Sequence, residues 1–246
     1  MTTFDLLNVA WPWVGLGMAI VLLFVLFNTD VFRSNEGSRW RDLIWLAWLA
    51  IPVYMIHQFE EYASHMSDWN YAMVNFFYSA SAPFARMGFE MNLPPAHFPL
   101  VNIIFVWVGL PTAAMICRRN PVVGVASYGF ILANAMMHVV SGPVLGMSVS
   151  ENAGFFTGLF LFIPLAIWVI ITMRKTYNLP IKAIVISMVS GILNHISLFA
   201  CILSGLIGLP AGTIIMDFVT GFVPIITAWL LCKIFKVKFD KKQRRY

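Results

Sequence analysis

The sequence predicts an all-α fold: a polytopic membrane helix bundle of seven transmembrane helices, with the N-terminus outside and the C-terminus inside. Of the 246 residues, 60% are hydrophobic and only 11% are charged, whereas about a quarter of a soluble domain is charged. The apolar residues also gather in windows of about 20, the length of helix that crosses the hydrocarbon core. We therefore expect one membrane-embedded domain, residues 1–246, that crosses the inner cell membrane several times and is surrounded by lipids.

Seven apolar windows define the expected spans. The first is not read as a signal peptide, because it lacks a basic segment before it, with Asp5 as the only charge there, and has no convincing cleavage site. Four spans contain a proline that should kink the helix, namely Pro52, Pro111, Pro164 and Pro224. The expected spans are residues 11–27, 43–63, 99–117, 121–141, 153–173, 182–205 and 213–235.

Basic residues set the expected orientation. The segments between spans one and two, three and four, and five and six, together with the C-terminal tail, hold all but one of the 16 Lys and Arg residues, the exception being Arg86. Because Lys and Arg concentrate on the cytoplasmic side, the N-terminus should lie outside and the C-terminus inside. The net charge of +5 then reflects topology and attraction to an anionic inner leaflet. Nucleic acid is not an expected partner, since it would need a folded basic face.

The longest connection is residues 64–98, on the expected outer side. It is rich in aromatic residues and carries Pro94 and Pro95 near its end. Such a segment suits an interfacial helix or a lid over a cavity, and an aromatic belt without a gating role is the alternative. We do not expect its two histidines, His65 and His97, to be ligands.

The second span ends in a cluster of ionisable residues, His57-Gln-Phe-Glu60-Glu61. Spacings of three and four residues put the imidazole and both carboxylates on one face of a helix. Ionisable groups at the end of a membrane span are costly to keep there and indicate a functional site by default. An imidazole with two carboxylates forms either a metal-ligand set or an acid–base set. Interfacial charges that only end the helix are the alternative.

Ionisable residues on three other spans fall at a similar depth. Counted from the inner ends of the spans, His57, His138, His195 and Asp217 lie roughly 20–25 Å across the bilayer. The inner halves of the spans are nearly free of ionisable residues, which argues against a transporter and for a pocket open to the outer face. Taken singly, each histidine could be a packed core residue, and Asp217 could be a cap. Candidates for contacting the substrate or supporting the ligands are Asn134, Asn194 and Thr157.

The residue types leave several chemistries open. Three histidines and three carboxylates favour zinc or iron over magnesium, which prefers an all-oxygen shell. Zinc with three protein ligands would lower the pKa of bound water toward about 7, and two irons would resemble a carboxylate-bridged bundle site. Without a metal, a glutamate kept protonated by desolvation could protonate an alkene, an epoxide or a leaving group of a lipid.

The motif at residues 57–61 resembles that of the HXXEE family of bacterial membrane proteins. A second block of that family, an Asn and a His on a later helix, matches Asn134 and His138. A third block matches Gly154, Thr157 and Pro164, although Ala153 replaces the usual proline before the glycine. The resemblance covers roughly residues 43–173 and implies a membrane protein of largely unassigned reaction.

A fainter similarity links the chain to small multi-span terpene cyclases and sterol-isomerase-like proteins, which use intramembrane carboxylates as acids. It rests on length and span number. Glu60 or Glu61 together with Asp217 would fill such a carboxylate pair.

We therefore predict a metal-dependent membrane enzyme, a hydrolase or oxidoreductase, that acts on a lipid-like or amphiphilic small molecule entering from the outer leaflet beside residues 64–98. The expected metal ligands are His57, His138 and His195, with one of Glu60 and Glu61 completing the shell and the other acting as base. One alternative is a metal-free acid-catalysed isomerase or terpene cyclase that uses Glu60 or Glu61 with Asp217. Another is a non-catalytic carrier or sensor of a metal or small molecule. The sequence does not fix the oligomeric state.

Overall fold

The computed structural model describes residues 3–34, 37–63, 88, 93–94, 96–145, 149, 152–207 and 209–239, and the side chains of 3–8, 141, 145 and 206 are not included. Over these residues the chain is helical, with no strand. In order the helices are α1 (Thr3–Asn28), η1 (Arg39–Arg41), α2 (Leu43–Tyr62), α5 (His97–Asn102), η2 (Ile103–Gly109), α6 (Leu110–Cys117), α7 (Pro121–Gly124), α8 (Ser127–Leu145), α9 (Phe155–Thr157), η4 (Gly158–Phe162), α10 (Ile163–Lys175), α11 (Ile181–Leu206), α12 (Pro210–Thr220) and α13 (Val223–Ile234).

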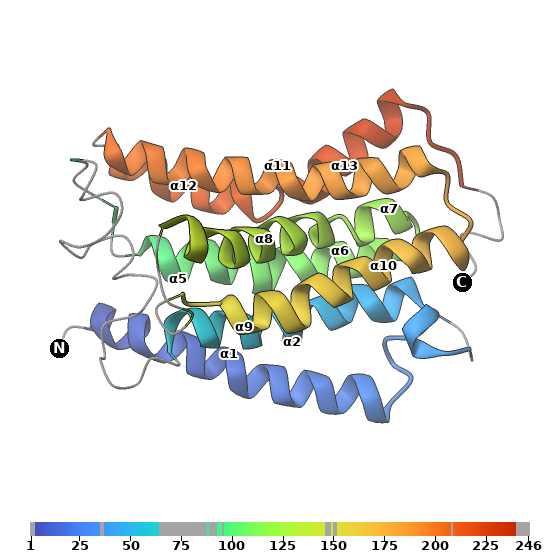
Figure 1. The fold of residues 1–246 in the computed structure, drawn as a ribbon, viewed down its shortest axis with the longest axis horizontal. Coiled ribbons are helices and arrows are strands. Elements are labelled where there is room, and N and C mark those ends of the chain that lie inside the picture. Colours follow the sequence, from blue (N-terminus) through green and yellow to red (C-terminus); the bar gives the residue numbers. More distant parts are fainter. Residues whose placement is uncertain are drawn as a thin grey trace.

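The helices run along the long axis of the molecule (Figure 1). Helix α1 forms one side, α11 with α12 and α13 forms the opposite side, and α5, α6 and α8 lie between them (Figure 1). Helix α2 packs against α1 and α6, and α8 packs against α11. This arrangement makes α2 and α8 the inner helices that carry the predicted site.

Within the described part of the chain, six helical stretches are long and apolar enough to cross a membrane. A seventh is reached only if α12 and α13, which are bent by 58° relative to each other, count as one span. The helical class is thus confirmed with six or seven candidate spans, and the predicted orientation stays a prediction. The six stretches are Val9–Asn28, Leu43–Tyr62, His97–Cys117, Pro121–Val144, Phe155–Lys175 and Ile181–Gly205.

The last expected span, residues 213–235, is broken rather than continuous. Helix α12 ends at Thr220, and α13 starts at Val223. A Cβ on Gly221 would lie 2.5 Å from Cγ2 of Ile104, so the chain turns where its backbone approaches the third span most closely. Pro224 has no N–H to donate to the carbonyl of Thr220, and this removes a hydrogen bond that would hold the helix straight.

Two other spans contain a π-helical segment, and each segment ends two residues before a proline. Segment η2 precedes Pro111, and η4 precedes Pro164. A proline ring clashes with the carbonyl four residues earlier, and a wider π turn relieves that clash. The prolines were expected to kink these spans, and here they coincide with locally widened turns.

Helix α2 forms the core of the bundle, since nearly every residue from Leu43 to Tyr62 is buried. Its start is held by Asp42, whose carboxylate accepts the N–H groups of Ile44 at 2.9 Å and Trp45 at 3.4 Å. The hydroxyl of Tyr177 accepts the N–H of Leu43 at 3.1 Å. Burial and the Asp42 carboxylate raise the pKa of Tyr177, which keeps the phenol neutral. These contacts fix the axial position of α2 and therefore that of its ionisable end.

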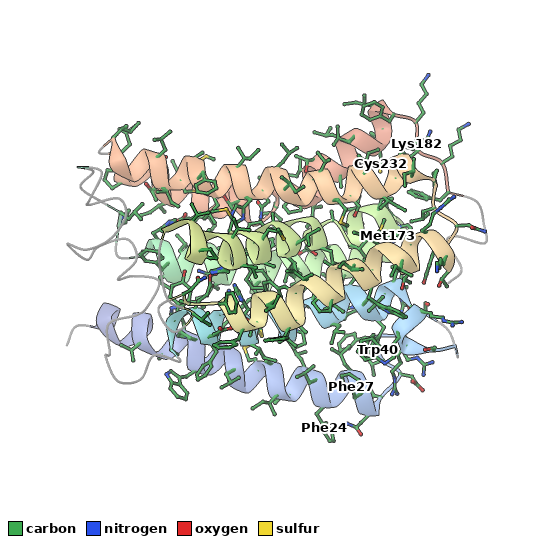
Figure 2. All side chains as sticks on the ribbon, in the orientation of Figure 1. Phe24, Phe27, Trp40, Met173, Lys182 and Cys232 are labelled. Atoms are coloured by element: carbon green, nitrogen blue, oxygen red, sulfur yellow. The ribbon has the colours of Figure 1, made fainter. Side chains whose placement is uncertain are left out.

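The outer surface of the bundle is apolar over much of its length. Phe24 on α1 points away from the other helices (Figure 2) and is 67% exposed. Large apolar side chains are also exposed on α11 and α13, for example Ile196, Leu203 and Trp229. Contiguous apolar surface of this extent is typical of a protein surrounded by lipid.

Candidate metal centre

Helix α2 presents His57 and Glu61 toward the interior of the bundle. The two residues are four apart, so their side chains lie one above the other on the same helix face. His57 is fully buried and Glu61 is 5% exposed. The distance from Nε2 of His57 to Oε1 of Glu61 is 3.4 Å.

His138, from the middle of α8, completes a three-residue cluster. Its Nε2 lies 2.9 Å from the same Oε1 atom of Glu61, and the two imidazole rings are 4.9 Å apart and inclined by 75°. One ligand atom from each of His57, Glu61 and His138 lies within 4.8 Å of the others. Two segments about 80 residues apart in the sequence thus place two imidazoles and one carboxylate around one point.

The spacing of these atoms fits a metal ion. Tetrahedral zinc with bonds of about 2.0–2.1 Å separates its ligand atoms by about 3.3 Å, and an octahedral iron would hold neighbouring ligand atoms about 3 Å apart. The nitrogen-to-oxygen distances of 3.4 and 2.9 Å are close to both values. Two histidines and one carboxylate are also the ligand set of several zinc hydrolases and of non-haem iron oxygenases.

Thr157 defines which nitrogen of His57 carries the proton. Oγ1 of Thr157 lies 2.6 Å from Nδ1 of His57, and the same hydroxyl donates its hydrogen to Oε2 of Glu60. A hydroxyl has one hydrogen, so it must accept at its other contact, and Nδ1 of His57 is therefore the donor. A neutral His57 then carries its lone pair on Nε2, the atom that faces Glu61.

No described group donates a hydrogen bond to this lone pair on Nε2 of His57. Among the residues that the structure describes, Nε2 of His57 is buried without a hydrogen-bond partner, and the atom opposite it is a carboxylate oxygen. Two acceptors facing each other in a buried site are unfavourable, and a cation between them would satisfy both. The fixed tautomer resembles the arrangement in which a carboxylate, through the outer ring nitrogen, orients a metal-binding histidine.

Glu60 and Glu61 have different surroundings although they are adjacent. Both oxygens of Glu60 are used: Oε1 accepts the N–H of Phe156 at 2.9 Å, and Oε2 accepts the N–H of Thr157 at 2.7 Å in addition to its hydroxyl. Glu60 therefore binds the start of the fifth span to α2. The structure brings Glu61, and not Glu60, to the two imidazoles.

Gly154 lets the backbone approach the two imidazoles. Its φ is +82°, in the left-handed region that favours glycine. A Cβ there would lie 2.7 Å from Cε1 of His57 and 2.9 Å from Cε1 of His138. Any side chain at this position would displace both rings, so the glycine closes the site on one side.

Further contacts from the fifth span and α8 hold the rings in place. The side chain of Asn152 donates to the carbonyl of His138. The ring of Phe162 packs on His57 with centroids 4.3 Å apart, and Tyr54 covers another edge at 5.5 Å. Asn134, one turn before His138, is buried, with its Oδ1 unpartnered among the described residues.

The other predicted site residues lie outside the three-residue cluster. His195 on α11 is 8% exposed and packs on Phe130 with ring centroids 5.0 Å apart. Asn194, its neighbour, accepts a hydrogen bond from Ser197. Asp217 on α12 is fully buried and contacts a different histidine, His97. The predicted lid, residues 64–98, lies for the most part outside the described residues, as do His65 and Glu151.

Two buried polar residues, His97 and Gln58, make contacts that were not predicted from the sequence. Oδ1 of Asp217 lies 2.8 Å from Nδ1 of His97. Gln58, inside the motif but on another helix face, donates to Oδ1 of Asn102 at 3.0 Å, and Asn102 donates to the Tyr62 hydroxyl at 3.2 Å. The signal for His97 was its place at the entrance of the third span, at the level of Asp217.

Together, the fold and this cluster define a protein that is helical over its described residues, with helices apolar enough to cross a membrane and a buried His/Glu site. Residues 48–169 match the sequence model of a family described as "Protein of unknown function with HXXEE motif". This match confirms the resemblance to the HXXEE family seen in the sequence, and the matched segment holds all three cluster residues. The searches of curated proteins and of solved structures found no match.

Proposed function

We propose that this protein is an integral membrane metalloenzyme, a hydrolase or an oxidoreductase, in which His57, Glu61 and His138 hold one zinc or iron ion. The observation that carries the proposal is that Nε2 of His57 is unpartnered among the described residues. The contact of Thr157 with Nδ1 favours the tautomer in which Nε2 has a lone pair, and this lone pair faces the carboxylate of Glu61. These three residues would hold the ion, which would supply Lewis acidity to a bound water or substrate.

The residues around the cluster then have distinct roles. Glu60 and Thr157 position His57 from its outer nitrogen. Because both oxygens of Glu60 accept backbone N–H groups, we assign it positioning rather than proton transfer. Phe162 and Tyr54 exclude water from one face of His57.

A lipid-like or amphiphilic substrate agrees with the surroundings of the cluster. The ligand atoms lie toward the C-terminal ends of α2 and α8, which are largely apolar helices, and the outer surfaces of α1, α11 and α13 are apolar. A molecule dissolved in the bilayer would reach such a site without crossing water. The predicted orientation places this end in the outer leaflet.

Metal content tests the proposal directly. Protein purified in detergent without chelator should contain about one zinc or iron per chain by elemental mass spectrometry, and His57→Ala or His138→Ala should lose it. His195→Ala is the matched control: it removes a buried imidazole that lies outside the cluster, so it should keep the metal. A wild-type protein that holds no metal, even after incubation with zinc or ferrous iron, would overturn the proposal.

A metal-free acid–base enzyme is the second candidate, and one contact favours it. Nε2 of His138 lies 2.9 Å from Glu61, a normal distance for an imidazole N–H that donates to a carboxylate. In this case activity would survive strong chelators and would depend on Glu61 as the proton carrier. The metal measurement separates the two candidates, since only the first binds an ion through His57.

A further inference from the structure

A second pair of buried ionisable residues lies outside the metal-ligand cluster. His97 is the first residue of α5, and Asp217 is in the middle of α12, 120 residues later. His97 is 2% exposed and Asp217 is fully buried. Nδ1 of His97 lies 2.8 Å from Oδ1 of Asp217, which is the distance of a strong hydrogen bond to a carboxylate.

The pair leaves one acceptor atom, Oδ2 of Asp217, without a geometric hydrogen bond in the described part of the chain. A carboxylate only accepts hydrogen bonds, so Nδ1 of His97 must be protonated, and a neutral ring then carries its lone pair on Nε2. The second oxygen of Asp217, Oδ2, is buried with no hydrogen-bond partner among the described residues. The Cys201 thiol, a weak donor, interacts with this carboxylate. A stronger donor at Oδ2, supplied by a ligand, would lower the cost of burying the carboxylate.

Asp217 belongs to a polar strip between α12 and α11. Thr213, Asp217 and Thr220 lie on one face of α12 and are each at most 1% exposed. The hydroxyl of Thr213 donates to the carbonyl of Cys201 at 3.4 Å, and the hydroxyl of Thr220 lies 3.5 Å from the Cys201 thiol. Asp217, between the two threonines, therefore faces α11 at the level of Cys201.

Hydroxyl groups continue the strip toward the middle of the bundle. Oγ of Ser197 lies 3.2 Å from Oγ1 of Thr220 and 3.3 Å from Oδ1 of Asn194. Nδ2 of Asn194 is buried without a partner among the described residues. The strip thus ends in an unused donor, and it begins at Asp217 with an unused acceptor.

We infer that His97, Asp217 and this strip form a second binding site, which takes the alcohol end of an amphiphilic molecule. A hydroxyl group donates one hydrogen, which Oδ2 of Asp217 can accept, and its oxygen can accept from a hydroxyl of the strip. A neutral alcohol adds no charge to a site that already pairs an imidazole with a carboxylate. The ring of Phe98, 5.1 Å from that of His97, supplies an apolar neighbour for the rest of the molecule.

This inference rests on the proposed function only for the lipid-like class of ligand, because it uses no residue of the metal cluster. The two can therefore fail separately. All measurements below are made on chelator-treated protein, in which a metal at His57, Glu61 and His138 plays no part.

Nitrogen NMR of protein labelled with ¹⁵N-histidine tests the site. The wild-type His97 should show the tautomer with hydrogen on Nδ1 and none on Nε2, and Asp217→Asn should return it to the Nε2–H form that free imidazole prefers. His97→Gln assigns the signal, and Asp217→Glu, which retains a carboxylate, should preserve the wild-type tautomer. An Nε2–H tautomer in the wild-type protein would overturn the inference.

Titration of the wild-type protein with 1-decanol tests the ligand and needs no variant. Decanol should shift the His97 nitrogen signals in a saturable manner, whereas decane, which has the same chain and no hydroxyl, should not. Thr213→Val should weaken the effect of decanol if the strip supports the alcohol. Equal shifts with decane and decanol, or no shift with either, would show that the pair is only a structural contact between α5 and α12.

Discussion

Oγ1 of Thr157 lies 2.6 Å from Nδ1 of His57, although the two residues are 100 positions apart in the sequence. The contact joins the fifth span to α2. Because the same hydroxyl donates its hydrogen to Glu60, it can only accept from Nδ1 of His57, and Glu60 thereby orients the imidazole. The motif residues His57 and Glu60 are therefore connected through a third residue. This explains why one motif carries two glutamates: Glu61 faces the cluster, and Glu60 orients the histidine.

Replacing Thr157 should weaken metal binding without removing a ligand. Thr157→Val keeps the size of the side chain but releases Nδ1 of His57, so the imidazole can adopt the other tautomer and turn Nε2–H toward the metal position. Loss of such a supporting contact typically weakens metal affinity by about 10–100-fold. Competition with a zinc indicator measures the change. Thr157→Ser retains the hydroxyl and should bind zinc as the wild-type protein does; equal affinities for Val and Ser variants would contradict the assigned role.

Gly154 should tolerate no side chain. In Gly154→Ala the new methyl group would lie 2.7 Å from Cε1 of His57 and 2.9 Å from that of His138, and the backbone would remain at φ +82°. We expect the free energy of unfolding to fall by about 1–3 kcal/mol and the metal content to fall with it. Gly17→Ala is the control, since a Cβ at Gly17 in α1 meets no atom within 4 Å. Thermal unfolding and metal analysis of both variants test this, and equal stability and metal content in the two variants would contradict it.

The sequence predicted the helical class and the residues of the three-residue cluster because both depend on local patterns. Apolar windows of about 20 residues report spans directly, and the spacing of His57 and Glu61 fixes their common helix face. Depth in the membrane then paired them with His138, and the structure brings these three together. Depth gives position along a helix but not rotation about it, so the sequence could not show that His195 lies outside the group of three converging ligand atoms.

Other features depend on contacts between distant segments and could not be read from the sequence. The division of roles between Glu60 and Glu61 follows from the backbone N–H groups of the fifth span. The partner of Asp217 depends on how α12 packs against α5, and the break near Gly221 depends on its approach to Ile104. The prolines predicted bends, but not that Pro111 and Pro164 would coincide with π segments.

Removal of the metal should lower thermal stability in a way that depends on His57. A ligand that binds only the folded state stabilises it by about 2.7 kcal/mol at a concentration 100 times its dissociation constant. Zinc added to chelator-treated protein should therefore raise the unfolding temperature of the wild-type protein and of His195→Ala. His57→Ala should not respond. A similar increase in His57→Ala would mean that zinc acts at another place, such as the exposed acidic group Asp30.

The orientation predicted from the basic residues can be measured with single cysteines. The native Cys117, Cys201 and Cys232 are buried and can be replaced by alanine. A cysteine introduced at Val149, between α8 and α9, should react with a membrane-impermeant maleimide in intact cells, whereas one at Arg119, between α6 and α7, should react only after the cells are opened.

Both positions are exposed in the structure, so access to reagent depends on the side of the membrane rather than on packing. Because Val149 lies near the end of α8 that carries His138, labelling from outside would also place the metal cluster in the outer half of the bilayer. Labelling of the Arg119 position from outside, with protection at position 149, would invert the topology. The substrate would then have to reach the cluster from the cytoplasmic leaflet, and the Lys- and Arg-rich segments between the helices would face away from the cytoplasm.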